Sequence, residues 1–340
     1  MKVLELKDVK KTFQKNKKTF TAVDGVSFSI EKGECIGLVG ESGCGKSTIA
    51  RMVTHLEQTT SGEIFMNERN VTKAKGKELR NLYQNLQMVF QNPSDSFNPR
   101  IKLGSSIGEV LINFGKPRGE IKRTVAQLLE QVGLKSEFAS RYPHEVSGGQ
   151  CQRAAIARAI AIQPDLLICD EATSALDVSV QAQIVDLILK LRHEMNMSYL
   201  FISHDLALVQ SICDRVLVMH RGRIVEEGNT QDVIEYAAHP YTKLLLSSVF
   251  PIHPDTQWQI PSVPQVTEEE GDACRFWQRC PHCKEQCKKE RPQLKKSVNI
   301  ILLPAILLNK QYSKKGTTFS KGCSFFLCSG IFAFWEKRIK

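Results

Sequence analysis

The chain has 340 residues and a formal net charge of +10 at pH 7. A chain of this length can hold one large α/β domain with an appendix, or two modest domains. Residues 284–340 carry thirteen Lys or Arg and three acidic residues, whereas the rest of the chain carries 33 basic and 33 acidic groups. Because most of the chain is neutral, a dedicated nucleic-acid groove is not expected.

The N-terminal segment and the cysteines indicate the cytoplasm. Residues 1–18 have the pattern of polar strand and loop and lack the charged, apolar and cleavage regions of a signal peptide. The eleven cysteines are an odd number in a chain without such a peptide. We therefore expect reduced thiols or metal ligands in place of disulfides.

The first third of the chain predicts strands, a phosphate-type loop and then helices. Residues 3–30 alternate short apolar runs with Lys-rich turns, which favours antiparallel strands at the edge of a sheet. The apolar run 35–39 stops at glycines and is followed by a helical pattern from Lys46. Apolar residues recur at helical spacing in 121–132 and 150–162, so we expect an inserted helical subdomain over about 92–162.

The next segments have the pattern of a parallel sheet covered by helices. Residues 166–169 and 199–202 are continuous apolar runs separated by an amphipathic helix over 178–195, as expected for strands buried on both faces. Residues 216–226 contain Arg-Gly between two apolar runs, a hairpin pattern. A Pro-rich, acidic stretch over 251–271 marks a domain boundary.

A phosphate-binding loop is predicted between the strand at 35–39 and the helix at Lys46. Its residues match the pattern G-x-x-x-x-G-K-S and are Gly40, Glu41, Ser42, Gly43, Cys44, Gly45, Lys46 and Ser47, with Thr48 next in the helix. Glycines let backbone N–H groups converge on phosphate, and the helix N-terminus adds a favourable dipole. Lys46 is expected to reach the terminal phosphates of ATP, and Ser47 to bind Mg²⁺.

Two carboxylates follow the buried run 166–169. Asp170 stands where a strand-end carboxylate can hold Mg²⁺ through water, and Glu171 where it can orient or deprotonate an attacking water. Asp-Glu after an apolar run is by itself more typical of a strand ending in solvent. The phosphate loop upstream makes the catalytic interpretation the stronger one.

The segment Val146-Ser147-Gly148-Gly149-Gln150 resembles the signature motif of ABC transporter ATPases, and the resemblance extends over residues 3–249. It implies an α/β P-loop NTPase fold: a RecA-like mixed sheet with an antiparallel β edge and an inserted helical subdomain. It also implies a Q-loop at Gln91, which would bind Mg²⁺ and act in catalysis, a D-loop at 174–177 ending in Asp177, and a switch histidine at His204.

In that family two ATPase domains meet head to tail, and the signature loop of one covers the nucleotide of the other. Ser147, Gly148, Gly149 and Gln150 would therefore serve the ATP of a partner subunit. An aromatic residue upstream of the phosphate loop stacks on adenine in the family. Phe13 is the candidate and Phe20 the alternative, and ordinary packing is the other interpretation for either.

Several further stretches resemble the ATPases of oligopeptide, dipeptide and nickel importers. They are residues 90–93, 147–153, 174–183 and 239–246. This likeness implies a second, different ATPase subunit, two membrane permease subunits, an extracytoplasmic solute-binding protein, and a peripheral location at the cytoplasmic face of the membrane. Peptide is the expected solute, with nickel or a metal chelate as the alternative.

The C-terminal part is expected to be a cysteine-containing extension over 251–295 and a divergent basic and apolar tail over 296–340, after an ATPase domain at 1–250. Cys274, Cys280, Cys283 and Cys287 form a cluster, for which the resemblance implies an iron–sulfur cluster or zinc. The alternative is thiols that bind nothing. The tail has two explanations, an anomalous or frameshifted C-terminus and a weakly membrane-seeking segment.

Two other functions are alternatives to transport. A non-transport ABC ATPase acting on DNA or ribosomes usually has coiled coils or two ATPase domains in one chain, and neither pattern is present here. A P-loop kinase has no reason to contain the signature sequence. The sequence therefore predicts an ATPase coupled to solute uptake.

Overall fold

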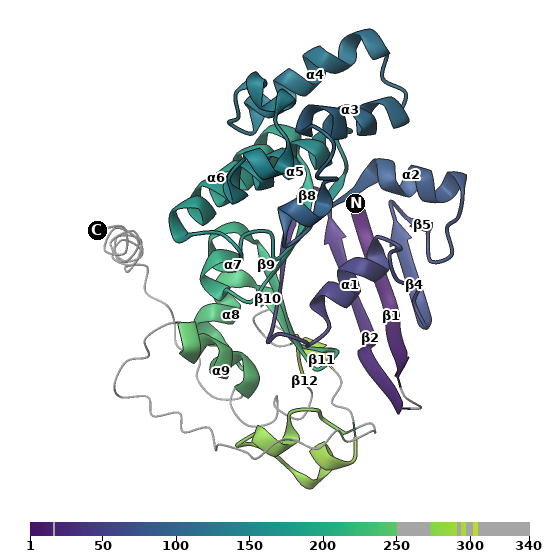
Figure 1. Ribbon diagram of the computed structural model, residues 1–340. Helices are drawn as coiled ribbons and strands as arrows, with labels where there is room; N and C mark the ends of the chain where they lie inside the picture. Colours follow the sequence, from purple (N-terminus) through teal and green to yellow (C-terminus); the bar gives the residue numbers. More distant parts are fainter. Residues whose placement is uncertain (16–17, 250–272, 291–293, 297–301, 305–340) are drawn as a thin grey trace.

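The computed structural model describes residues 1–15, 18–249, 273–290, 294–296 and 302–304. The predicted linker at 251–271 and most of the predicted tail at 296–340 lie outside these ranges. The described residues form two β-sheets, with helices packed around them and a helical lobe at one end (Figure 1). No helix among them is long and apolar enough to cross a bilayer.

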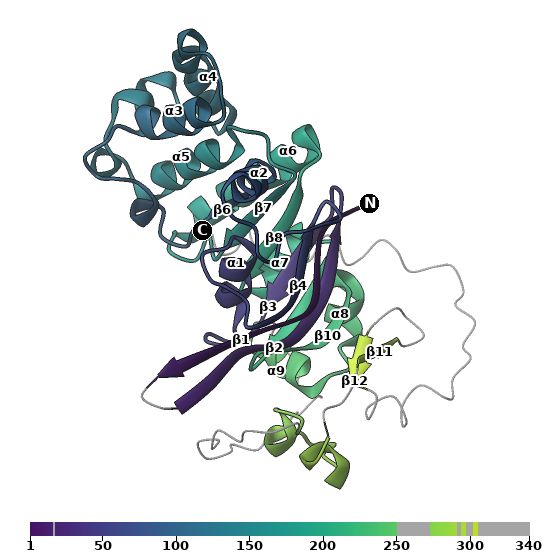
Figure 2. The ribbon, with the colours of Figure 1, turned by 90° about the vertical axis from the view of Figure 1, so that its right-hand side faces the viewer.

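The smaller sheet is antiparallel and comes from the N-terminal part of the chain. Its strands run in the order β2-β1-β4-β5; they are β1 (Lys2–Lys15), β2 (Lys18–Glu31), β4 (Ser61–Met66) and β5 (Arg69–Asn70). The antiparallel strands predicted here are confirmed, and they form a sheet of their own next to the parallel one. Figure 2 shows the long β1–β2 hairpin extending from the body.

The larger sheet has eight strands in the order β11-β12-β10-β9-β3-β8-β7-β6. They are β3 (Cys35–Val39), β6 (Leu86–Val89), β7 (Leu166–Asp170), β8 (Ser198–Ser203), β9 (Arg215–His220), β10 (Arg223–Asn229), β11 (Leu294–Lys296) and β12 (Leu302–Pro304). The central pairs from β9 to β6 are parallel. Every residue of β3, β7 and β8 is buried, as predicted for strands covered on both faces.

The C-terminal strands of this sheet are antiparallel. Arg221 and Gly222 join β9 to β10 with φ of 43° and 84°, the two positive values that a tight two-residue hairpin turn requires. The predicted hairpin is confirmed. Beyond it, Leu302 of β12 pairs with Glu227 of β10, so a short piece of the predicted tail extends the central sheet.

The helices cover both faces of the large sheet and form the lobe. They are α1 (Lys46–Val53), α2 (Lys77–Asn85), α3 (Leu103–Asn113), α4 (Arg118–Gln131), α5 (Gly148–Ile160), α6 (Val178–Met195), α7 (Leu206–Ile212), α8 (Thr230–Tyr236) and α9 (Pro240–Val249). Because neighbouring residues of a strand point to opposite faces, Cys35 and Val39 of β3 pack in the core beside the lobe. Ile36 and Leu38 pack in the core beside the smaller sheet.

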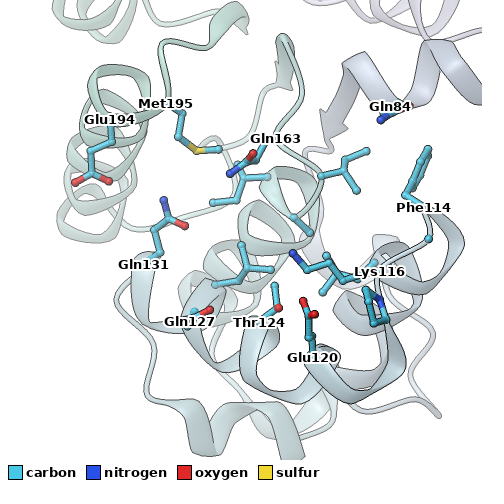
Figure 3. Close-up of a pocket in the computed structure, with 17 residues that line it drawn as sticks. Gln84, Phe114, Lys116, Glu120, Thr124, Gln127, Gln131, Gln163, Glu194 and Met195 are labelled. Carbon is cyan, nitrogen blue, oxygen red and sulfur yellow. The ribbon is translucent and has the colours of Figure 1, made fainter.

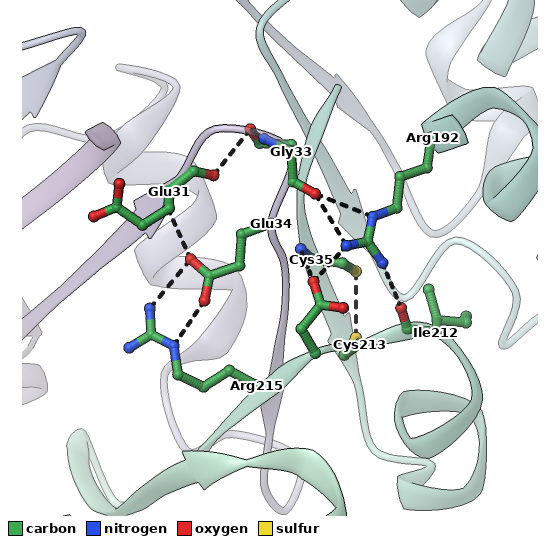
Figure 4. Close-up of polar contacts among 10 residues, drawn as sticks. Glu31, Gly33, Glu34, Cys35, Arg192, Ile212, Cys213 and Arg215 are labelled. Carbon is green, nitrogen blue, oxygen red and sulfur yellow. Dashed lines mark hydrogen bonds and ion pairs between the residues drawn. The ribbon is translucent and has the colours of Figure 1, made fainter. Parts of the chain in front are cut away.

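A polar network holds the beginning of β3 (Figure 4). Arg192 of α6 donates to the carbonyl oxygen of Gly33 from Nε at 3.2 Å and from Nη2 at 3.0 Å, and it pairs with Asp214. Asp214 accepts a hydrogen bond from the backbone N–H of Cys35, with 2.9 Å between Oδ2 and N. The strand that leads into the phosphate loop is thus tied to α6 and to the residue before β9.

Gly37 in the middle of β3 has no room for a side chain. A Cβ there would lie 2.4 Å from Cγ1 of Val209 on α7. We expect Gly37→Ala to lower the free energy of unfolding by about 1–3 kcal/mol in urea denaturation, because the core cannot absorb the extra methyl group. The double variant Gly37→Ala/Val209→Ala should lose less stability than the two single variants lose together. Strictly additive losses would show that this contact is not the cause.

Candidate functional site

The predicted phosphate loop lies between β3 and α1, as its spacing requires. Gly45 is the N-cap of α1 with φ of 110°, and a Cβ on it would lie 2.4 Å from the carbonyl oxygen of Ala22. Gly43 has φ of 79°, and nothing lies within 4 Å of a Cβ placed there. The loop therefore packs tightly against β2 on one side and leaves open space at Gly43 on the other.

Lys46 lies within this loop and is only 4% exposed. Its ammonium group donates to the carbonyl oxygens of Gly40 at 2.8 Å and Glu41 at 3.1 Å. A buried ammonium group beside a helix N-terminus favours an anion. The loop, its open side at Gly43 and this cation fit a phosphate chain.

Ser47 and Asp170 meet between α1 and the end of β7. The hydroxyl of Ser47 donates to Oδ1 of Asp170 at 3.0 Å. Burial raises the pKa of Asp170, and the hydrogen bond from Ser47 opposes that rise. A hydroxyl beside a carboxylate provides the oxygen ligands that Mg²⁺ prefers, so these two residues fit that ion.

The three predicted catalytic residues lie together, with Glu171 close to both Gln91 and His204. Glu171 accepts a hydrogen bond on its Oε2 from Nε2 of Gln91 at 3.0 Å, and Nδ1 of His204 lies 3.8 Å from its Oε1. Its own backbone has φ of 47°, unusual for a residue other than glycine, and its N–H donates to the carbonyl oxygen of Ile202 at 3.0 Å. Ser174, which the sequence suggested only as part of the D-loop, also accepts from Gln91 at 3.2 Å.

The signature residues begin α5 on the helical lobe. Ser147 is its N-cap: its hydroxyl accepts from the N–H of Gln150 at 3.3 Å, and the Gln150 side chain accepts from the N–H of Ser147 at 3.0 Å. Ser147 and Gly148 are exposed, so this helix start faces solvent. Among the described residues no hydrogen bond joins 147–150 to the phosphate loop of the same chain.

Gly149 and Asp177 lie where α5 meets α6. A Cβ on Gly149 would lie 2.5 Å from Cγ1 of Val180, so the close packing of these two helices depends on this glycine. Asp177 is the exposed N-cap residue of α6. The signature and D-loop residues thus share one face of the molecule.

The two candidate adenine contacts lie side by side. Phe13 of β1 and Phe20 of β2 are cross-strand partners in the hairpin, which puts their side chains on the same face. Phe20 is 50% exposed. It lies two residues before Ala22, which packs against Gly45 of the phosphate loop, or about 7 Å along the strand.

The cysteine cluster does not form a metal site among the described residues. Cys274 and Cys287 are joined through backbone atoms, with 2.8 Å between N and O. Burial raises the pKa of the Cys280 thiol to about 11, which favours a protonated group. No group of three or more His, Cys, Asp or Glu side chains in the described ranges is arranged to hold a metal ion, so the prediction of an iron–sulfur cluster or zinc is not supported. The nine cysteines in those ranges are all free thiols.

A cavity of about 730 Å³ lies at the helical lobe, and Figure 3 shows the residues that line it. Polar side chains such as Gln127, Gln131 and Gln163 line it together with apolar ones such as Leu128 and Met195. It contains none of the predicted site residues.

Comparisons with known proteins match two parts of the chain. Residues 23–174 match the family model "ABC transporter", and residues 225–287 match "Oligopeptide/dipeptide transporter, C-terminal region". The oligopeptide transport ATP-binding protein OppF of Escherichia coli is 44% identical over 302 residues, covering 86% of this chain and 90% of that protein. The di/tripeptide transport ATP-binding protein DppF of Pseudomonas aeruginosa is 44% identical over 283 residues, covering 81% and 86%.

Solved structures give the same result for the fold. The ATP-binding cassette MJ0796, described as a dimer in a post-hydrolysis state bound to ADP and Pi, superposes with a TM-score of 0.61 at 28% identity, covering 67% of this chain and 98% of that one. The protein cbiO1 of Clostridium perfringens, part of the transporter complex cbiONQ, gives a TM-score of 0.62 at 26% identity, covering 69% and 91%.

Proposed function

The chain belongs to the ABC transporter ATPases with an oligopeptide/dipeptide transporter C-terminal region, and from this premise we propose that it is the ATP-hydrolysing subunit of a peptide importer. The proposal depends on two hydrogen bonds, one from Ser47 to Asp170 and one from Gln91 to Glu171. Together they bring a phosphate loop and two strand-end carboxylates into one site. The nickel alternative is not favoured, because the relatives compared above have peptide-transport names.

Each site residue has a role that follows from its position. Lys46 and the loop N–H groups would bind the phosphates of ATP. Ser47, Asp170 and Gln91 would hold Mg²⁺, whose positive charge would offset the negative charge of the phosphoryl group. Glu171 accepts a proton from the attacking water and passes it to solvent or to His204. Gln91 donates to Glu171 and so holds that carboxylate in place.

The other half of the site comes from a second ATPase subunit. Ser147 and the exposed N-terminus of α5 provide hydrogen-bond donors and a positive dipole end, which a single chain leaves pointing to solvent. A head-to-tail pair would place this helix start on the partner's nucleotide. Closing the pair on ATP then links nucleotide binding to motion of the membrane subunits.

A groove beside Gln91 is suited to a membrane subunit at the cytoplasmic face. It measures about 480 Å³, and its lining combines apolar residues such as Leu56, Met88 and Phe90 with polar ones such as Glu109 and Arg158. Leu56 is 55% and Phe90 37% exposed, which is unusual for large apolar side chains grouped on a surface. A permease helix in this groove would lie next to the Q-loop and would sense its movement.

We expect Leu56→Asp to abolish copurification with tagged permease subunits and to reduce transport at least about tenfold, because a charge would be buried in an apolar contact. Leu56 is exposed, so ATP affinity and melting temperature of the isolated subunit should stay unchanged. Ile112→Asp is the matched control, since Ile112 is 45% exposed and outside the groove. If Leu56→Asp copurifies with the permease subunits as wild type does, the permease does not bind in this groove.

The function itself is tested by uptake into vesicles that contain the complete transporter and an extracytoplasmic binding protein. ATP-dependent uptake of labelled oligopeptides, lost in Lys46→Ala, is the expected result. Uptake of nickel without uptake of any peptide would overturn the assigned substrate. ATP hydrolysis without any membrane partner in copurification would overturn the transport function.

A further inference from the structure

Tyr241 connects the C-terminal part of the chain to the phosphate loop. Its side chain is buried, and its hydroxyl oxygen accepts a hydrogen bond from the backbone N–H of Glu41, with 2.9 Å between the two atoms. The two residues are 200 positions apart in the sequence. Glu41 belongs to the phosphate loop, whereas Tyr241 stands at the beginning of α9, beyond the last long strand of the central sheet.

The Tyr241 ring is held by an aromatic cluster. Its centroid lies 4.3 Å from that of His220 and 5.7 Å from that of Phe276, and Phe276 itself is 2% exposed. The backbone N–H of Tyr241 donates to Nδ1 of His239 at 3.0 Å. Burial lowers the pKa of both histidines to about 3, so the cluster stays uncharged at neutral pH. The hydroxyl therefore has little freedom to turn away from the loop.

Phe276 comes from the cysteine-containing segment 273–290, and that segment reaches the loop directly. Nη1 of Arg279 lies 3.9 Å from Oε1 of Glu41, and its guanidinium group lies over the Phe276 ring at 5.7 Å. Both charged groups are partly exposed, so the ion pair by itself contributes little. The hydrogen bond from Glu41 to Tyr241 is the stronger of the two contacts.

A second connection runs through the turn between β9 and β10. The N–H of Gly222 donates to the carbonyl oxygen of Cys44 in the phosphate loop at 2.7 Å. Arg275 donates to the carbonyl oxygen of Arg221 in the same turn, and its Nη2 lies 3.0 Å from Oδ2 of Asp24. The loop is thus supported at Glu41 and at Cys44 by elements that the segment 273–290 contacts.

We propose that Tyr241 is a positioning residue for the phosphate loop, and that the segment 273–290 influences ATP binding through Tyr241 and Arg279. The proposal rests on the proposed function, since it takes residues 40–47 to bind the phosphates. A backbone N–H that loses its partner lets the loop adopt other conformations, and the apparent affinity falls with the fraction of molecules in the binding-competent one.

The test compares Tyr241→Phe with wild type in binding of a fluorescent ATP analogue and in ATP turnover. Tyr241→Phe keeps the ring and removes only the hydroxyl, so we expect about fivefold weaker nucleotide binding, with turnover at saturating ATP within about twofold of wild type. Hydrogen exchange at the Glu41 amide should become faster. Arg279→Gln should weaken binding about twofold or less.

Tyr236→Phe is the matched control, because Tyr236 on α8 is 50% exposed. This variant should change neither nucleotide binding nor ATP turnover. If wild type binds the analogue and Tyr241→Phe binds it equally well, this inference fails while the proposed function stands. If wild type itself does not bind, the function fails. Should Tyr241→Phe not fold, Phe276→Leu keeps the hydroxyl but loosens its support, and unchanged binding there would count equally against the proposal.

Discussion

Replacing Glu171 by glutamine should leave ATP bound and slow its hydrolysis by about 10²–10⁴-fold, the range that a general base contributes. The amide cannot take a proton from water, but its oxygen can still accept the hydrogen bond that Gln91 donates at 3.0 Å. The geometry of the site is therefore kept while its chemistry is lost. Phosphate release by the assembled transporter and equilibrium binding of ATP are the two measurements.

Glu194→Gln is the control for this change. Glu194 lies near the end of α6 and pairs with Lys190 on the surface, so the variant makes the same substitution away from the site. It should hydrolyse ATP like wild type. Turnover within about twofold of wild type in Glu171→Gln would show that another group, and not this carboxylate, activates the water.

Ser147→Ala should reduce ATP turnover at the composite site that Ser147 completes by about 10²–10³-fold, comparable to removing one preorganised donor from a transition-state site. The hydroxyl also caps α5, so a stability loss of about 1 kcal/mol is expected alongside. Asn229→Ala separates the two effects, because Asn229 caps α8 by accepting from the N–H of Gln231 at 3.0 Å and should affect stability only.

Mixing two inactive variants identifies the partner. In a head-to-tail pair of identical chains, Lys46→Ala combined with Ser147→Ala leaves one complete site, so the mixture should recover part of the wild-type turnover. No recovery is expected where the partner is a different ATPase subunit, as the family resemblance implies. Full turnover by a lone chain, unaffected by Ser147→Ala, would contradict a shared site altogether.

The chemistry-bearing loop and strands could be predicted from the sequence because their patterns are local. Residues 40–47 combine glycines with positive φ, a lysine and a helix start within eight positions, and β3, β7 and β8 are continuous apolar runs. The turn at Arg221 and Gly222 is equally local. Such features depend on the backbone conformations and the burial of a few neighbouring residues. The residue types at those positions already determine both.

The tertiary structure alone decided which distant residues meet. Gln91 and Glu171 are 80 positions apart and Glu41 and Tyr241 are 200 apart, and no spacing rule reports such contacts. The same reason explains why four cysteines close in sequence form no metal-ligating group in the described ranges: convergence of thiols depends on turns and packing, which the intervals between cysteines do not specify. Contacts over long separations follow from how strands order themselves in a sheet, and that order is a property of the whole core.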